Sequence, residues 1–340
     1  MKLFKIITVF ITAVALTACS NNAEEQDNQS SVSDLSSGLT GNSPETILST
    51  VPNGAQAVSL FGKPLSMPLP EQNLVDNLNE AKADYDSDPN NVDYLIWYGR
   101  KLAYAGDYRA AIRVYSQGIE MYPDEPRLYR HRCHRYLTTR EFDRALFDCQ
   151  KGASLIEGQE DSVEPDGAPN PANIPIYTRH STIWYHLGLA YYFKRDWQKA
   201  HEAFQAGKNL HVNNDMEVSF SHWNYMALRR MGRDEDASAS VADIPDDIVV
   251  YESEPYLKLL SLYKGEISVD ELWKDNIEIE DNSAFKYGIA NWYFYNGEYG
   301  KADSLMKSIA LPTEVSGYGW AAFGFIAAEA DLKDKLNNNK

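Results

Sequence analysis

Positive charge is scarce in this sequence. The 340 residues include 49 Asp and Glu but only 32 Lys and Arg, so the formal net charge at pH 7 is -17. A field of this sign repels other polyanions, which disfavours nucleic acid and an anionic membrane surface as general partners. Any site that binds an anion must therefore be a local feature of the fold.

The motifs of common catalytic sites are missing as well. The chain contains no G-x-S-x-G nucleophile turn, no phosphate-binding P-loop and no H-E-x-x-H metal motif. Its three cysteines are Cys19, Cys133 and Cys149. Catalysis by Cys133 or Cys149 would require an exposed and activated thiol, whereas both fall at interior positions of the repeats described below. We therefore predict a protein that is not an enzyme and that holds no cofactor or metal.

Long apolar runs are also absent, apart from one near the start of the chain. Lys2 and Lys5 precede an apolar segment, residues 6–16, that is too short to span a bilayer and is typical of a signal peptide. The segment ends in the sequence LTAC, which resembles a bacterial lipobox. This resemblance implies a lipoprotein signal peptide over residues 1–18 and a palmitate-type lipid anchor on Cys19. The alternative is an ordinary secretory signal with a chance cysteine.

The residues after Cys19 indicate where such a lipoprotein would be found. Ser20 follows the cysteine, and in lipoproteins the lack of Asp at this place implies the outer membrane of a bacterial envelope, facing the periplasm or the cell surface. The stretch from Ser20 to Gly54 is rich in Ser, Asn, Gln and acids, without Lys, Arg or an apolar period. We therefore expect a disordered tether over residues 19–58.

The clearest repeat pattern lies in residues 184–207, WYHLGLAYYFKRDWQKAHEAFQAG. Its apolar spacing predicts two helices, and the polar residues 194–196 form a short turn that folds them into an antiparallel hairpin. The spacing W-x2-L-G-x2-Y followed by A-x3-F resembles the tetratricopeptide repeat, TPR. Gly188 and Ala200 then let the two helices approach closely. One hairpin cannot bury its own apolar faces, so further hairpins are expected.

The same pattern recurs along most of the chain, and the segments RLYRHRCHRY and WYHLGLAYY resemble a bacterial TPR family without an assigned activity. The resemblance implies an all-α TPR solenoid of about six hairpins. An insertion rich in proline and acids interrupts it, and this insertion is either a functional loop or a solvated excursion. We expect an N-terminal extended segment and capping helix at 59–91, repeats at 92–314 with the insertion at 157–179, and a C-terminal capping helix and tail at 315–340.

In TPR proteins the first helices of successive repeats line a concave groove that holds a peptide or protein. Transferring this register to the chain selects a basic and aromatic set: Arg100, Arg127, Arg130, His134, Tyr185, Tyr192, His222, Arg229 and Arg230. Arginine forks suit carboxylate or phosphate, and tyrosine adds rigid contact area. The resemblance thus implies a scaffold for a protein or peptide with acidic groups. The alternatives are an anionic small molecule or glycan under the acidic loop, and a groove whose arginines pair with that loop.

The second repeat contains two unusual features. Cys133 and Cys149 fall on the two helices of one hairpin, so they can form a disulfide in an oxidising envelope or serve as small packing residues. Arg132 stands where the TPR pattern has a large apolar residue. A buried arginine destabilises the fold unless it is paired, so Arg132 must contact an acid or extend to solvent.

The lipid anchor is directly testable. Replacing the predicted acylation site, Cys19→Ala, removes the thiol to which the lipid would be attached, so the variant should move from the membrane fraction to the soluble fraction. The measurement is fractionation of cells that express the full chain, with wild type as the reference. Retention of the variant in the membrane fraction would show that Cys19 is not the anchor.

Overall fold

The computed structural model describes residues 54–274, 282–312 and 319–338. The predicted signal peptide at 1–18, the acylation site Cys19 and most of the predicted tether at 19–58 lie outside these ranges. Among the described helices, none combines the length and the apolar character needed to cross a membrane.

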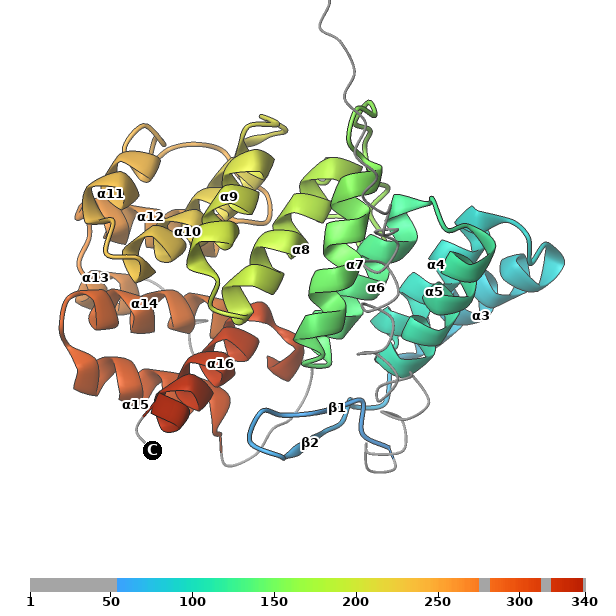
Figure 1. The fold of residues 1–340 in the computed structure, drawn as a ribbon, viewed down its shortest axis with the longest axis horizontal. Helices are drawn as coiled ribbons and strands as arrows, with labels where there is room; N and C mark the ends of the chain where they lie inside the picture. Colours follow the sequence, from blue (N-terminus) through green and yellow to red (C-terminus); the bar gives the residue numbers. More distant parts are fainter. Residues whose placement is uncertain (1–53, 275–281, 313–318, 339–340) are drawn as a thin grey trace, which may run out of the picture. The chain divides into compact units, whose positions relative to one another are not determined.

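The described residues form a succession of antiparallel helical hairpins, coloured from cyan to red along the chain in Figure 1. The paired helices are α4 (Val92–Tyr104) and α5 (Tyr108–Met121), α6 (Pro126–Thr138) and α7 (Phe142–Leu155), α8 (Arg179–Phe193) and α9 (Trp197–Lys208), α10 (Asn214–Arg230) and α11 (Asp234–Val241), α12 (Glu254–Lys264) and α13 (Val269–Lys274), α14 (Ser283–Tyr295) and α15 (Tyr299–Ala310). This array confirms the predicted all-α fold of TPR type.

Close packing within the hairpins depends on small residues at the expected places. A Cβ atom on Gly188 would lie 2.2 Å from the ring of Phe204 on the facing helix α9. Ala200, also on α9, is completely buried. Larger side chains at either position would force α8 and α9 apart, as the repeat pattern predicts.

The N-terminal part differs from the expected tether. Ala57 and Val58 form the strand β1 (Ala57–Val58), which pairs antiparallel with β2 (Pro64–Leu65). Ala57 is fully buried, and Arg109 Nε donates a hydrogen bond of 2.7 Å to the carbonyl oxygen of Gln56. The prediction of disorder through residue 58 is therefore wrong at its end, because these residues pair with the folded body. The helix α3 (Gln72–Ser87) follows and packs on α4.

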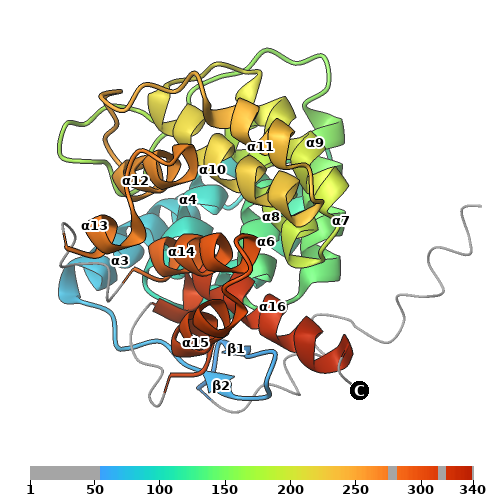
Figure 2. The same ribbon diagram turned by 90° about the vertical axis from the view of Figure 1, so that its left-hand side faces the viewer.

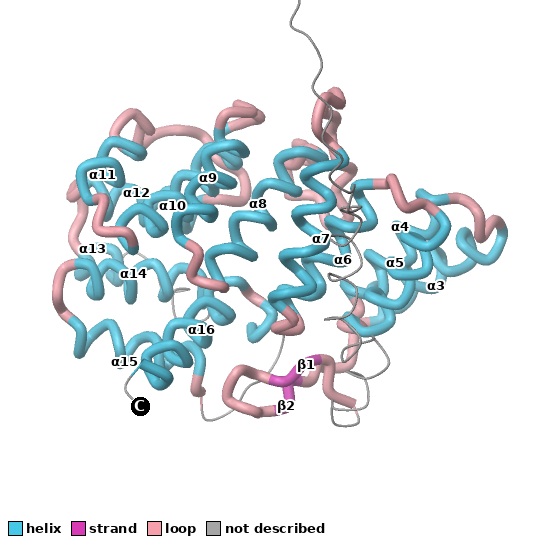
Figure 3. Tube along the Cα trace, in the orientation of Figure 1, coloured by secondary structure: helices cyan, strands magenta, loops and turns pink. Residues whose placement is uncertain are grey.

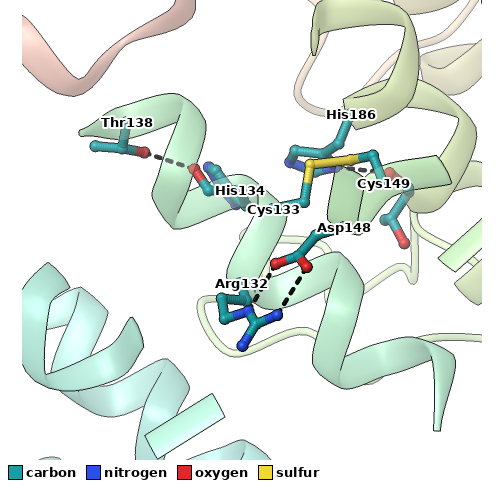
Figure 4. Close-up of a disulfide and its surroundings, with 8 residues drawn as sticks. Arg132, Cys133, His134, Thr138, Asp148, Cys149 and His186 are labelled. Atoms are coloured by element: carbon teal, nitrogen blue, oxygen red, sulfur yellow. Dashed lines mark hydrogen bonds and ion pairs between the residues drawn. A yellow bond between two sulfur atoms is a disulfide. The ribbon is translucent and has the colours of Figure 1, made fainter. Parts of the chain in front are cut away.

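Two links join the helices of the second hairpin (Figure 4). Cys133 on α6 and Cys149 on α7 form a disulfide. Beside it, Arg132 Nε and Nη2 donate to the two carboxylate oxygens of Asp148, at 2.7 and 2.8 Å. Arg132 is thus held by an acid, the first of the two outcomes expected from its place in the repeat.

The last helix, α16 (Phe323–Asn338), follows a 3-10 turn at Gly319–Ala321. It packs on α14 and α15, as a helix that caps the final hairpin should, and it also contacts α8 in the third repeat. This second contact brings the C-terminal end of the chain onto earlier repeats, as can be followed in Figure 2. The helix therefore covers part of the inner face in addition to the last hairpin.

Arginines from the repeats hold α16 in this position. Arg140 Nε lies 2.8 Å from a carboxylate oxygen of Glu329, and Arg195 Nη1 lies 2.6 Å from Asp331. Arg140 and Arg195 occupy equivalent turns after α6 and α8, and both have left-handed backbone conformations with φ of 66° and 64°. The equivalent residue after α4 is Gly106, which adopts this conformation without a Cβ clash. The two arginines accept the local strain and reach α16.

The Arg132–Asp148 pair yields a stability prediction. Asp148→Ala should lower the free energy of unfolding by about 3 kcal/mol, because it leaves the Arg132 guanidinium largely buried without its anion. The matched control is Asp143→Ala on the same helix, whose carboxylate pairs with Lys194 but is 89% exposed. The control should change stability by less than about 1 kcal/mol. Urea unfolding of both variants measures the difference, and equal losses would contradict the expected asymmetry.

Candidate functional site

A cavity of about 370 Å³ lies between the repeats. Its lining comes from α4, α5, α6, α8 and α10, from the loop between α7 and α8, and from the first residues of α12 and α16. The loop, drawn in pink in Figure 3, corresponds to the predicted insertion. The volume falls within the range typical of small-molecule sites.

Basic side chains on α4 and α6 form one wall of the cavity. Arg100 comes from α4, while Arg130 and Arg135 come from α6. The lining residues of α6 are at positions 130, 131, 134 and 135. Positions 130 and 134 are four residues apart, as are 131 and 135, so all four lie on one face of the helix. The Arg100 guanidinium carbon lies 4.3 Å from the centre of the Trp97 ring, which supports the charge by a cation–π contact.

The loop carries a buried carboxylate into this basic wall. Glu164 Oε1 lies 3.3 Å from Arg130 Nη1, 3.3 Å from His131 Nε2 and 3.9 Å from Arg100 Nη1. The other oxygen, Oε2, accepts a hydrogen bond of 2.9 Å from Thr182 Oγ1. Arg100 Nη1 also donates to the carbonyl oxygen of Pro165 at 2.8 Å. The acidic loop therefore lies over the basic residues and pairs with two of the arginines.

Arg135 is the arginine that the loop does not neutralise. Its guanidinium carbon lies 5.0 Å from the centre of the Tyr108 ring. Within the described residues, its side chain forms neither a hydrogen bond nor an ion pair. Burial lowers the pKa of Arg135, but an arginine stays charged in proteins. The inner wall thus places three arginines against the one buried carboxylate of Glu164.

Two further acids line the cavity at more exposed positions. Glu252 is exposed, and its Oε2 accepts a hydrogen bond of 2.6 Å from the Tyr177 hydroxyl. Asp166 is half-buried, and its Oδ1 accepts from the backbone N–H of Ala168 at 2.9 Å. Both carboxylates serve the conformation of the loop, and neither forms an ion pair with Arg135.

Three histidines also line the cavity, and all are neutral in the folded protein. Burial and the nearby arginine charges lower the pKa values of His131, His134 and His186 well below the ordinary value. The rings of His134 and His186 have their centres 4.4 Å apart. His186 Nδ1 lies 2.6 Å from the carbonyl oxygen of Thr182. Because a carbonyl only accepts, Nδ1 carries the proton, and the buried Nε2 is an acceptor without a partner.

Aromatic side chains close the cavity on the side of α16. Phe323, the first residue of that helix, has its ring centre 5.3 Å from that of His134, 5.8 Å from that of His186 and 6.2 Å from that of Tyr185. The Tyr185 hydroxyl accepts a hydrogen bond of 2.9 Å from Trp223 Nε1, which fixes its ring. The position of α16 therefore determines how far the cavity is enclosed.

Four of the predicted groove residues meet at this cavity: Arg100, Arg130, His134 and Tyr185. The other five do not. Arg127 pairs with Glu125 and Asp93 at the start of α6. Arg229 pairs with Asp234 at 2.9 Å, and the buried Arg230 pairs with Asp331 of α16. These three arginines are occupied by ion pairs within the protein.

Tyr192 and His222 are part of the core instead of a groove surface. The Tyr192 hydroxyl lies 3.0 Å from that of Tyr287 on α14. The His222 ring stacks on Tyr256 of α12 with ring centres 4.3 Å apart. The prediction of a continuous basic and aromatic groove over four repeats is thus wrong in its second half, because α12, α14 and α16 cover that part of the inner face.

The prediction from the repeat register did not include several residues that line the cavity. Arg135 could have been found from the sequence, because it lies one residue after His134 and five after Arg130 on the same helix. Phe323 had no such signal, since only the docking of α16 brings it to the third repeat. The pairing of Glu164 with arginines of two repeats also needed the tertiary structure.

The structure also bears on a metal or thiol site. Within the described ranges, no group of three or more His, Cys, Asp or Glu residues is arranged to hold a metal ion. Cys133 and Cys149 are joined in the disulfide, so neither offers a thiolate as a ligand or nucleophile.

No protein-family model and no curated protein matches the sequence. Among solved structures, the chain is similar to YrrB, a TPR protein with an unusual peptide-binding site, at 13% identity over 75% of this chain and 99% of that chain, with a TM-score of 0.40. A TPR protein from Parabacteroides merdae is 17% identical over 78% of this chain and 86% of that chain, with a TM-score of 0.42. A chain of the APC/C hetero-tetramer Cut9–Hcn1 is 15% identical over 75% of this chain and 46% of that chain, with a TM-score of 0.47. Likeness at such low identity concerns the fold alone.

The neutral histidines predict acid sensitivity. Burial lowers the pKa of His222 to about 3, and the three cavity histidines are also lowered. An unfolded histidine titrates near 6.5, so the unfolded state binds more protons between these values. Stability is therefore complete above about pH 6.5 and falls towards pH 3, by about 1.4 kcal/mol per pH unit for each histidine.

Urea unfolding at a series of pH values measures this slope. His222→Phe removes one buried titrating group. It should therefore reduce the dependence of the unfolding free energy on pH by about 1.4 kcal/mol per pH unit, which corresponds to one proton. The control is His211→Asn, because His211 is exposed and has a positive φ that asparagine tolerates. A slope that is the same in wild type and His222→Phe would show that His222 is not held neutral by the fold.

Proposed function

We propose that this protein is a non-catalytic binding protein of TPR type that takes an anionic group into the cavity beside Arg135. The observation that carries the proposal is the half-buried guanidinium of Arg135, which lines the cavity and has no acidic partner among the described residues. A charge that is partly removed from water is more stable beside a counter-charge, so an anion bound there stabilises the folded protein. A carboxylate matches the planar fork of an arginine in two parallel hydrogen bonds.

Two sources could supply such a carboxylate: a small acid, or an acidic peptide or protein partner. The cavity volume of about 370 Å³ suits a small molecule. An extended peptide would have to run along an inner face that the acidic loop and α16 already occupy. The geometry therefore favours a small anionic ligand, although TPR proteins as a class commonly bind peptides.

We further infer that the protein works in the bacterial envelope, held by a lipid on Cys19. The LTAC sequence at the end of the apolar segment supports this inference. The Cys133–Cys149 disulfide agrees with it, since disulfides form and persist in oxidising compartments such as the periplasm and cell surface.

Thermal unfolding in the presence of candidate anions tests the binding proposal. One arm uses succinate and D-glucuronate as small carboxylates, and the other uses an oligo-glutamate peptide. A ligand at a hundred times its Kd stabilises by about 2.7 kcal/mol, which should raise the Tm by several degrees. A rise with the small acids alone identifies a small ligand, whereas a rise with the peptide alone identifies a peptide partner.

Arg135→Gln should lose the Tm rise, because it removes the charge that holds the anion. The matched control is Arg229→Gln, since Arg229 is a partly buried arginine outside the cavity that pairs with Asp234. It should keep the full response. The proposal is wrong if no carboxylate raises the Tm of wild type, or if Arg135→Gln responds as wild type does.

A further inference from the structure

The cavity offers a hydrogen-bond acceptor next to its unpaired cation. His186 Nε2 is buried and has no partner, and the proton on Nδ1 is held by the Thr182 carbonyl 2.6 Å away. With this tautomer the free nitrogen can accept a hydrogen bond but cannot donate one. A ligand therefore satisfies His186 only if it carries an O–H or N–H group.

The charges of the wall decide between these two donors. Arg100, Arg130 and Arg135 lie in the same cavity, and only one buried carboxylate, Glu164, faces them. A protonated amine would be repelled by this excess of positive charge. Hydroxyl and amide N–H groups both donate a hydrogen bond without adding charge. Amide N–H groups belong mainly to peptides, whose path along the inner face is occupied by the acidic loop and α16, so hydroxyl is the donor that fits.

His134 extends the hydroxyl-binding surface towards Arg135. Its ring centre lies 4.4 Å from that of His186, and within the described residues neither of its nitrogens forms a hydrogen bond. A neutral imidazole has one donor and one acceptor, which matches a second hydroxyl. His134 and Arg135 are adjacent on α6, so one compact ligand can contact the cation and both histidines.

Aromatic side chains form a further part of the cavity wall. Phe323 and Tyr185 have ring centres 6.2 Å apart, and Phe323 also packs against both histidines. Small-molecule sites combine such apolar surface with a few polar groups that fix orientation. An aromatic face packs well against the C–H groups of a saturated ring whose hydroxyls point to the rim.

From this arrangement we propose that the ligand is a hydroxylated carboxylic acid of the acidic-sugar class. Its carboxylate pairs with Arg135, its hydroxyls bond to His186 and His134, and its ring packs on Phe323 and Tyr185. This inference rests on the proposed binding of an anion at Arg135 and adds the requirement for hydroxyl groups.

The test is calorimetric titration of the full chain with four probes. D-Glucuronate and D-galacturonate carry both a carboxylate and hydroxyls, D-glucose carries hydroxyls alone, and cyclohexanecarboxylate carries a carboxylate alone. We expect one of the two sugar acids to bind at least tenfold more tightly than either D-glucose or cyclohexanecarboxylate. For cyclohexanecarboxylate, the missing hydrogen bond to a buried acceptor accounts for a difference of this size, and for D-glucose the missing ion pair with Arg135 does so.

Variants of His186 then identify the group that reads the hydroxyl. His186→Phe should lose the preference for the sugar acid over cyclohexanecarboxylate, because the acceptor is gone while the ring shape remains. His186→Gln retains an acceptor atom and should recover part of the preference. Circular dichroism and Tm of both variants establish that they are folded, and Arg229→Gln again serves as the variant outside the cavity.

The outcomes separate this inference from the proposed function. If cyclohexanecarboxylate binds as tightly as both sugar acids and Arg135→Gln abolishes all three, anion binding stands and the acidic-sugar class is wrong. If D-glucose binds as tightly as the sugar acids, the anion is not required and both proposals fail. A preference that survives His186→Phe would overturn the role of His186.

Discussion

The ion pairs between repeat arginines and the C-terminal helix α16 determine the inner face of this protein. Arg140 and Glu329 have side chains only 2% and 0% exposed, so each would be a costly buried charge without the other. Arg195 and Arg230 add a second anchor at Asp331. Because these contacts fix α16 against the second, third and fourth repeats, this helix covers part of the inner face, and a cavity of about 370 Å³ remains beside it.

The turns of the repeats are adapted to this docking. The second residue after the first helix of a hairpin adopts a left-handed conformation, which glycine accepts most easily, and Gly106 occupies this place in the first repeat. In the next two repeats the place belongs to Arg140 and Arg195. An arginine there costs backbone strain, but it lets the turn reach an acid on α16. These two arginines thus hold the helix whose first residue, Phe323, lines the cavity.

The inner wall of the cavity is positively charged, whereas the whole chain has a negative net charge. A protein with a net charge of -17 concentrates arginines and histidines on one face of α6, opposite the long loop between α7 and α8 that carries Glu164. That carboxylate neutralises the part of the wall formed by Arg100 and Arg130, and it leaves Arg135 unpaired. Local excess charge of this kind distinguishes a binding cavity from packing defects in a core.

The sequence by itself determined the local architecture. Helical periodicity and the W-x2-L-G-x2-Y spacing predicted the hairpins, and Gly188 and Ala200 their close approach. The charge of Arg132 predicted that it contacts an acid or extends to solvent. These features depend on neighbours within one repeat, so they leave a periodic signal. The pairing of Arg140 with Glu329, 189 residues apart, leaves none. Only the tertiary structure decided that α12, α14 and α16 cover the second half of the predicted groove and that Arg100, Arg130, His134 and Tyr185 remain around a cavity.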